Sequence, residues 1–253
     1  MTATGDLSGR VAIVTGSARN IGRAIALELA AAGASVVINA RASAREAQAV
    51  VDEINKAGGR AVLALADITE PAAVKGLVSV AIESFGRLDI LVNNAGVRKE
   101  TAFADLGYAE WKQITGIILD APYLCAHEAL PHLIASGQGA IVNLGGLSAH
   151  TGSAKRAHVI AAKMGVVGLT RALAHDLAPH NITVNCVAPG LIDTARQASS
   201  TGGVPAHHAG HMPLVGRKGR SEEIASLVRF LSGPEARYIT GQTIHANGGL
   251  FLS

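Results

Sequence analysis

The sequence predicts an α/β fold, a doubly wound, seven-stranded parallel sheet with helices on both faces. Short apolar runs alternate with longer amphipathic segments along the whole chain, which is typical of a parallel sheet covered on both faces. Of the 253 residues 49% are hydrophobic but only 3% aromatic, so the core must consist mainly of Ala, Val, Ile and Leu. Such small side chains suit the close packing of helices on a sheet.

Local signals place the individual elements. Pro71 stands in the first turn of one helical segment and Gly33 follows the end of another, the positions that these residues favour. The predicted strands are Val11–Thr15, Ser35–Asn39, Ala61–Ala66, Ile90–Asn93, Ala140–Leu144, Thr183–Ala188 and Thr243–Ala246. The predicted helices are Ile21–Ala32, Ala44–Ala57, Pro71–Phe85, Ala109–Ala135, Arg156–Leu177 and Glu222–Leu231. Right-handed crossovers between these strands complete the doubly wound arrangement.

Composition narrows the classes of function. No repeat or linker divides residues 1–253, so one domain is expected, with a substrate or lid loop at about 190–219. The net charge of +3 comes with no basic cluster, which excludes a nucleic-acid footprint. We expect a cytoplasmic protein, because no signal peptide begins the chain and no apolar stretch approaches the roughly 18 residues of a membrane span. Cys125 and Cys186 are predicted to be buried free thiols.

The turn after the first strand has the composition of a phosphate-binding loop. It runs from Thr15 through Gly16 and Gly22 to Ala24, between a strand and a helix. Small residues at such a turn let backbone N–H groups approach a pyrophosphate at the N-terminus of the helix. The sequence therefore predicts a dinucleotide site at this edge of the sheet.

An ordered series of motifs resembles the short-chain dehydrogenase/reductase family, and within it the 3-oxoacyl-carrier-protein reductases. The motifs are Thr15–Gly22, Asp67, Asn93–Gly96, Asn185, Pro189-Gly190 with Thr194, Thr240–Gln242 and Asn247–Gly249, which cover nearly the whole chain. The resemblance implies a Rossmann-type fold, a small-molecule substrate and a homotetramer built through the two long helices and the C-terminal strand. One departure is Asn20 in place of the middle glycine of the turn, and Asn tolerates positive φ better than other residues.

The expected cofactor is NADP(H) rather than NAD(H). A carboxylate at the end of the second strand would bind the ribose of NAD, and this chain has Asn39, Ala40 and Arg41 there. Arg19 and Arg41 can together pair with a 2′-phosphate, unless they are ordinary surface charges. The cofactor positions that the motifs imply are Gly16, Ser17, Arg19, Asn20, Ile21, Gly22, Arg41, Asp67, Ile68, Asn94, Ala95, Gly96, Lys163, Pro189, Gly190, Ile192 and Thr194.

Three of the four catalytic positions implied by the resemblance hold side chains that cannot exchange a proton. The family uses a tyrosine four residues before a lysine, a serine thirteen residues before the tyrosine, and an asparagine on the preceding long helix. Lys163 matches the lysine, but the other positions fall on Val159, Gly146 and Ile118. The tyrosines of the chain, Tyr108, Tyr123 and Tyr238, all lie far from Lys163 in sequence. Conventional oxidoreductase activity is therefore expected to be weak or absent.

Three hypotheses follow. The protein is an oxidoreductase in which another acid, such as His158, His150 or Lys163, replaces the tyrosine. Alternatively, the pocket performs non-redox lyase or hydratase chemistry with Lys163 as base or amine nucleophile. In the third hypothesis the site is inactive, and the protein binds a dinucleotide or serves as an interaction partner.

Two further groups bear on the ligand. His207, His208 and His211 lie in the predicted lid, but no acidic or thiol ligand stands near them in sequence, so no metal site is predicted. Arg98 and Lys99 follow Asn93–Gly96, where substrate groups often sit in the similar family, so an anionic or acyl-type substrate is expected unless they are plain surface charges.

Overall fold

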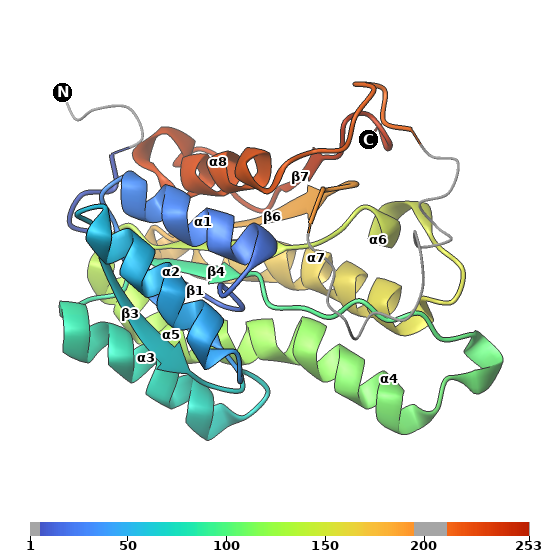
Figure 1. Ribbon diagram of the computed structural model, residues 1–253, viewed down its shortest axis with the longest axis horizontal. Coiled ribbons are helices and arrows are strands. Elements are labelled where there is room, and N and C mark those ends of the chain that lie inside the picture. Colours follow the sequence, from blue (N-terminus) through green and yellow to red (C-terminus); the bar gives the residue numbers. More distant parts are fainter. Residues whose placement is uncertain (1–5, 195–211, 253) are drawn as a thin grey trace.

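The computed structural model describes residues 6–194 and 212–252, and it confirms the α/β fold class (Figure 1). One seven-stranded sheet runs in the order β3-β2-β1-β4-β5-β6-β7, and every pairing is parallel. The strands are β1 (Val11–Val14), β2 (Ser35–Ala40), β3 (Arg60–Leu65), β4 (Ile90–Asn93), β5 (Ala140–Leu144), β6 (Thr183–Pro189) and β7 (Thr243–Ala246). The strand order reverses between β1 and β4, so a ligand cleft is expected at the carboxyl ends of these two strands.

Helices cover both faces of the sheet (Figure 1). The helices are α1 (Asn20–Ala31), α2 (Ala44–Lys56), α3 (Pro71–Phe85), α4 (Tyr108–Thr115), α5 (Ala121–Ser136), α6 (Ser148–Thr151), α7 (Ala157–Leu177) and α8 (Ser221–Ser232). Helices α1, α2 and α8 pack into one apolar cluster on one face, and α3, α5 and α7 form another on the opposite face. Both clusters consist almost entirely of Ala, Val, Ile and Leu, as the composition predicts, and Cys125 and Cys186 are buried and unpaired.

The long helix predicted over Ala109–Ala135 is interrupted by a π-helical turn, Gly116–Asp120, which joins α4 to α5. Hydrophobic periodicity does not report a local change from i→i+4 to i→i+5 bonding, so the sequence could not reveal it. The short helix α6 was also not predicted, because four residues are too few for a periodic pattern. Single 3₁₀ turns lie at Phe103–Asp105, Ala178–His180 and Pro234–Ala236.

One expectation about apolar length was wrong. Among the described residues the helical stretch Ala157–His180 is long and apolar enough to cross a membrane, with a mean hydropathy of 1.2 over its most apolar window. The prediction missed it because Lys163 and Arg171 interrupt the apolar run in sequence. The stretch packs against β5, β6 and α4, and a core helix of this kind passes the same length test as a membrane span.

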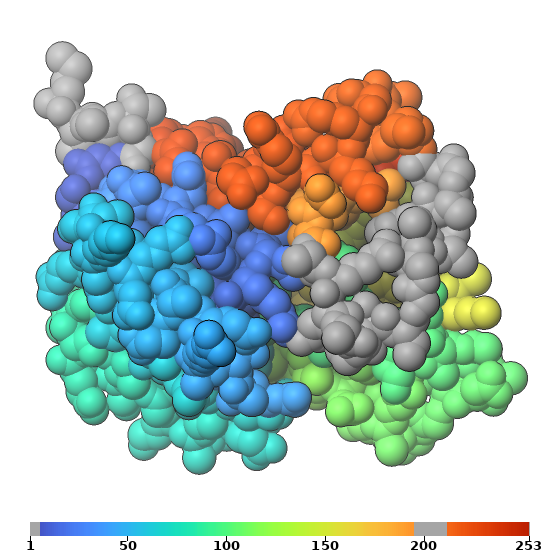
Figure 2. All heavy atoms as spheres, viewed as in Figure 1, coloured from blue at the N-terminus to red at the C-terminus, as the bar shows by residue number. Residues whose placement is uncertain are grey.

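The two ends of the predicted lid are joined. Ile192 and Gly219 form a parallel bridge, the amide of Asp193 donates to the carbonyl of Gly219 at 2.8 Å, and the amide of Gly219 donates to the carbonyl of Leu191 at 2.9 Å. Residues 191–193 and Gly219 thus lie side by side just beyond the carboxyl end of β6. In the space-filling view the surface is hollowed between the blue N-terminal part and the orange segment that follows residue 211 (Figure 2).

Candidate dinucleotide site and its catalytic face

The turn after β1 is held by close backbone contacts that only glycine permits. A Cβ on Gly16 would lie 2.9 Å from the Cα of Ala95, and Gly16 has φ +63°. A Cβ on Gly22 would collide with the carbonyl oxygen of Gly16. Asn20 adopts φ +51°, so the residue in place of the family glycine takes the left-handed conformation that Asn tolerates. The turn therefore keeps the shape of a phosphate-binding loop.

Asn94 fastens this turn to the end of β4. Its side-chain amide donates to the carbonyl of Thr15 at 2.8 Å and to that of Gly16 at 3.1 Å. The hydroxyl of Thr15 in return accepts hydrogen bonds from the amides of Asn94 and Ala95 at 3.0 and 3.1 Å. The predicted cofactor residues from β1 and β4 are thus brought together, and Asn94 positions the turn with its side chain.

The end of β2 presents no carboxylate to a ribose. Asn39 is buried, and its amide accepts from the amide of Gly16 and donates to the carbonyls of Ala64 and Ala66, each at 3.2 Å. Ser17 is also buried, and its hydroxyl donates to the carbonyl of Val14. Both predicted polar groups therefore support the turn with their side chains.

The predicted cations stand at the edge of this region. Arg19 and Arg41 are exposed, and the guanidinium of Arg41 lies 3.8 Å from the carboxylate of Asp67. Burial opposes ionisation of Asp67, but hydrogen bonds from Thr69 and the charge of Arg41 hold its pKa below the usual value. Arg41 and Asp67 consequently lie side by side at the carboxyl ends of β2 and β3, where the adenosine half of a dinucleotide would lie.

Lys163 lies on α7 and faces the ends of β4 and β5. Its Nζ donates to the carbonyl of Leu144 at 2.5 Å, and a Cβ on Gly96 would lie 3.8 Å from the same Nζ. The pKa of Lys163 is lowered to about 8, chiefly by burial; Cys186 opposes the shift, and the charges of Arg156 and Arg98 add to it. A substantial fraction of Lys163 is therefore a neutral amine near pH 8.

This shift predicts a pH dependence of stability. Between pH about 8 and the ordinary lysine value of 10.5 the unfolded chain binds more protons than the folded one, so stability rises with pH in this window. The variant Lys163→Met should lack this rise. The melting temperature of the wild-type protein should therefore increase relative to that of the variant as the pH is raised from 8 to 10.5. The exposed lysine variant Lys75→Met is the control. A constant difference between Lys163→Met and wild type across these pH values would contradict the shift.

Ile118 and Val159 lie together in a small apolar cluster beside Lys163. Ile118 is 1% and Val159 2% exposed, and both pack in the cluster that contains Ile114, Ala162 and Cys186. Ile118 lies in the π-helical turn, and such turns are frequent at functional sites. Gly146, after β5, has open space where a Cβ would stand. These three positions thus present hydrocarbon or no side chain at all.

The histidines suggested as substitute acids face elsewhere. His158 is fully buried, and its Nε2 lies 3.3 Å from the carboxylate of Glu110 on α4. Burial lowers the pKa of His158, and Glu110 opposes that shift. His150 packs edge-on against His245 with 4.4 Å between ring centroids, and both rings contact Phe251. His158 therefore connects α7 to α4, and His150 connects α6 to the C-terminal strand.

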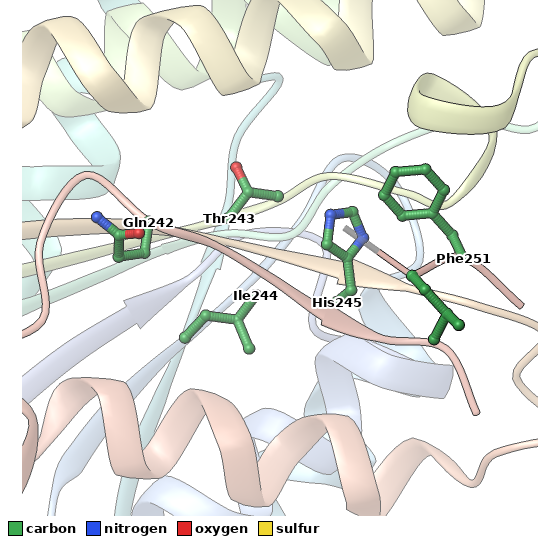
Figure 3. A pocket seen from close by; sticks show the side chains of 6 residues that line it. Gln242, Thr243, Ile244, His245 and Phe251 are labelled. Atoms are coloured by element: carbon green, nitrogen blue, oxygen red, sulfur yellow. The ribbon is translucent and has the colours of Figure 1, made fainter. Parts of the chain in front are cut away.

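The contact between His245 and Phe251 lies in a hollow beside β7. It is lined by Gln242, Thr243, Ile244, His245, Phe251 and Leu252. Figure 3 shows Thr243 and His245 pointing to one side of the strand, with Phe251 beside His245 and Ile244 on the other side. His150 and His245 thus belong to the C-terminal edge of the sheet, and this contact orients His150 toward β7.

Sequence reasoning missed one pair of polar residues near Lys163. Arg156 is 8% exposed, and its guanidinium donates to the hydroxyl of Ser148 at 3.2 Å. Arg156 precedes α7 and Ser148 begins α6, so the pair links the two segments that flank Val159 and Gly146. No sequence pattern pairs Arg156 with Ser148, because the contact joins two segments across a loop.

The remaining predicted residues follow β6 and β3. Pro189 ends β6, and Gly190 packs so tightly on Asn247 that a Cβ would lie 2.6 Å from its Cα. Ile192 and Thr194 follow at the start of the predicted lid, Ile21 is the second residue of α1, and Ile68 is buried after β3. His207, His208 and His211 lie outside the described residues, and within the described part no group of three His, Cys, Asp or Glu side chains gathers to hold a metal ion.

Comparisons with known proteins agree with this geometry. The family model described as enoyl-(acyl carrier protein) reductase matches residues 16–251. The chain belongs to the short-chain dehydrogenase/reductase family. It is 37% identical over 241 residues to the 3-oxoacyl-(acyl-carrier-protein) reductase FabG of Staphylococcus aureus, covering 95% of this chain and 98% of that protein.

Two further proteins show a similar degree of likeness to this chain. The (2S)-((R)-hydroxy(phenyl)methyl)succinyl-CoA dehydrogenase subunit BbsD of Thauera aromatica is 40% identical over 246 residues, covering 97% of this chain and 98% of that one. A short-chain dehydrogenase of Burkholderia cenocepacia, solved in complex with NADP, superimposes with a TM-score of 0.89 at 38% identity and covers 96% of this chain and 98% of its own. The family and fold expected from the motifs are thereby confirmed.

Proposed function

We propose that this short-chain dehydrogenase/reductase is an NADP(H)-binding protein, nominally a carbonyl or alcohol oxidoreductase, whose conventional activity is weak or absent. The observation that carries the proposal is the burial of Ile118 and Val159 in one apolar cluster beside Lys163. The family positions for asparagine and tyrosine fall on these two residues, and the serine position falls on Gly146. Hydride transfer to a ketone leaves an alkoxide that needs a proton, and these three positions supply none.

The small-residue turn and the cations beside it support NADP(H) as cofactor. The glycines leave the N-terminus of α1 accessible to a pyrophosphate, and Lys163 stands where the family lysine holds the nicotinamide ribose. When bound, NADP(H) supplies or accepts the hydride, and the chain only positions it. Asn39 offers no carboxylate, and Arg41 offers a guanidinium suited to a 2′-phosphate. The relative from Burkholderia cenocepacia was solved with NADP.

Replacing Arg41 by Ala should weaken NADPH binding by about tenfold or more and leave NADH binding nearly unchanged. The expected loss follows from the ~1.5–3 kcal/mol of a hydrogen bond to a charged group. Titration of the intrinsic fluorescence of NADPH and NADH on the wild-type and variant proteins measures it. The control is Arg45→Ala, an exposed arginine on α2. If wild-type protein bound NADH more tightly than NADPH, the cofactor assignment would be wrong.

The function itself is tested in two steps. NADPH should raise the melting temperature of the protein, because a ligand that binds only the folded state stabilises it. NADPH absorbance is then followed with a panel of simple ketones and 3-oxoacyl thioesters, the substrate class in the printed name of the Staphylococcus aureus relative. We expect thermal protection without appreciable turnover. Turnover at rates typical of reductases would overturn the proposal.

A second candidate function is non-redox chemistry at Lys163. The pKa of about 8 favours it, because a partly neutral, partly buried amine can act as a base or attack a carbonyl. Such a lyase or hydratase would form an imine between Nζ and a carbonyl substrate, with loss of water. Borohydride reduces an imine to a stable amine. An increase in the mass of the peptide that contains Lys163, after treatment with a carbonyl compound and borohydride, would therefore favour this candidate over the first.

Assembly into a homotetramer is part of the proposal and is supported by the family resemblance. Among the described residues β7 pairs only with β6, so one edge of this strand is available to another chain. The alternative of an inactive protein that serves as an interaction partner has some support, since the Thauera aromatica relative is named as a subunit. We place the protein in the cytoplasm and treat residues 1–253 as one domain with its lid at about 190–219.

A further inference from the structure

Three rings from separate parts of the chain meet beside β7. His150 on α6 lies edge-on against His245 on β7, with 4.4 Å between the ring centroids. The ring centroid of Phe251 lies 5.6 Å from that of His150 and 4.8 Å from that of His245, and Figure 3 shows Phe251 beside His245. We call these three residues the ring cluster. It fastens α6 and the C-terminal segment, residues 247–252, to the edge of the sheet.

One nitrogen of each histidine in the ring cluster is buried without a hydrogen bond. These atoms are Nε2 of His150 and Nδ1 of His245. Burying a polar atom that has no partner costs free energy, and the cost is far larger when the group is charged. The ring cluster therefore fits two neutral imidazoles and does not fit two imidazolium ions.

The charges around the ring cluster also oppose protonation. Burial lowers the pKa of both histidines, and the charges of His245 and Arg171 lower the pKa of His150 further. Arg171 is an exposed residue of α7. On β6 the residue paired with His245 is Ala188, and neither α6 nor the C-terminal segment contains a carboxylate side chain. Within the described part of the chain, no acidic side chain thus offsets a proton on either ring.

The C-terminal segment packs against residues 213–215. A Cβ on Gly248 would lie 2.9 Å from side-chain atoms of Pro213 and Val215. The amide of Val215 donates to the carbonyl of Gly248 at 3.3 Å. Release of the ring cluster would therefore loosen residues 213–215 as well as α6, which begins two residues after Gly146.

We infer that the ring cluster is a pH-sensitive latch, which holds the C-terminal segment and α6 on β7 while both histidines are neutral and opens when they are protonated. Two imidazolium rings with centroids 4.4 Å apart repel each other, and opening returns both to water. Histidines in the open state titrate near the ordinary value of 6.5, above their pKa in the closed latch. The closed state therefore binds fewer protons, and a fall in pH below 6.5 favours the open state. The latch is independent of the proposed function.

The test is hydrogen exchange of the C-terminal segment in the wild-type full chain. The amide of Gly249 donates to the side chain of Asn247 at 2.9 Å, and that of Leu250 donates to the carbonyl of Asn247 at 3.3 Å, so opening exposes both amides. After correction for the pH dependence of the chemical exchange rate, these amides should exchange about fivefold or more faster at pH 5.5 than at pH 7.5. The amides of β4 should show no such change, which separates opening of the latch from unfolding of the whole protein. Equal corrected rates at both pH values would overturn the inference.

Replacing both histidines by phenylalanine keeps three rings and removes both titrating groups. The double variant His150→Phe, His245→Phe should therefore exchange at the same corrected rate at the two pH values. The matched control His175→Phe, at an exposed histidine of α7, should keep the wild-type dependence. If the double variant kept this dependence, another titrating group would be responsible and the inference would be wrong. The wild-type measurement decides the matter even where the double variant fails to fold.

Discussion

The combined replacement Ile118→Asn, Gly146→Ser and Val159→Tyr is expected to raise NADPH-dependent ketone reduction at least 100-fold above the wild-type rate. General acid catalysis by a positioned hydroxyl typically contributes roughly 10²–10⁴-fold. Lys163 is already in place beside Gly96 to lower the pKa of the new tyrosine and to hold the cofactor ribose. The three changes therefore add the proton donor, the polarising hydroxyl and the relay amide to an existing framework.

The local packing accommodates these changes unequally. A serine at Gly146 meets no atom within 4 Å of its Cβ. Tyrosine at position 159 needs more volume than valine, and its neighbour Ile118 is replaced at the same time by a slightly smaller residue. Some loss of stability, about 1–3 kcal/mol, is expected from the added volume. Saturating NADPH during the assay partly offsets this loss.

The matched control is Ile118→Asn, Gly146→Ser and Val159→Phe, which carries the same ring without the hydroxyl. Both proteins are assayed by NADPH absorbance with the ketone panel, and their folding is compared by circular dichroism. Activity in the tyrosine protein alone would support loss of the proton donor as the reason for inactivity. Equal activity in the phenylalanine protein, or none in a folded tyrosine protein that binds NADPH, would contradict it.

Gly22→Ala should abolish the stabilisation by NADPH and lower the free energy of unfolding by about 1–3 kcal/mol. The added methyl group would collide with the carbonyl oxygen of Gly16 and the side chain of Asn94, and it would lie 3.0 Å from the Cα of Ser17. The turn must then open, which breaks the hydrogen bonds from Asn94 to Thr15 and Gly16. Both stability and the phosphate-binding geometry depend on these contacts.

Gly76→Ala is the matched control for this change. Gly76 is an exposed position in α3, and a Cβ there meets nothing within 4 Å. Alanine is a better helix former than glycine, so this variant should be more stable by up to about 1 kcal/mol and should keep its response to NADPH. Chemical denaturation with and without NADPH measures both variants. A Gly22→Ala protein that NADPH still stabilises would show that the turn is not the binding element.

The sequence was sufficient to predict the sheet and the turn. Strands such as Ile90–Asn93 and Ala140–Leu144 are found with the predicted bounds, because each is a short apolar run buried on both faces. The strained positions were also predictable, since Gly16 and Asn20 are residue types that adopt positive φ at low cost. Buried strands and positive-φ positions both depend on the residues at that point of the chain, so the sequence alone predicts them.

The partners of polar side chains could not be predicted in the same way. The contact of His158 with Glu110 joins α7 to α4, and that of Arg156 with Ser148 joins two segments across a loop. Each depends on the angle at which one helix packs on its neighbours, which no periodic pattern encodes. The π-helical turn Gly116–Asp120 adds to this difficulty, because it changes the rotational phase between α4 and α5.

The bridge between Ile192 and Gly219 closes the segment that we propose as the lid into a loop with a fixed base. The bridge fixes both ends of this segment to each other, and the amide of Val215 gives it one further attachment, to the carbonyl of Gly248. The entropic cost of closing a loop grows only logarithmically with its length, so insertions and deletions between these anchors cost little. We therefore expect changes of length between these two residues to leave the stability of the sheet nearly unchanged.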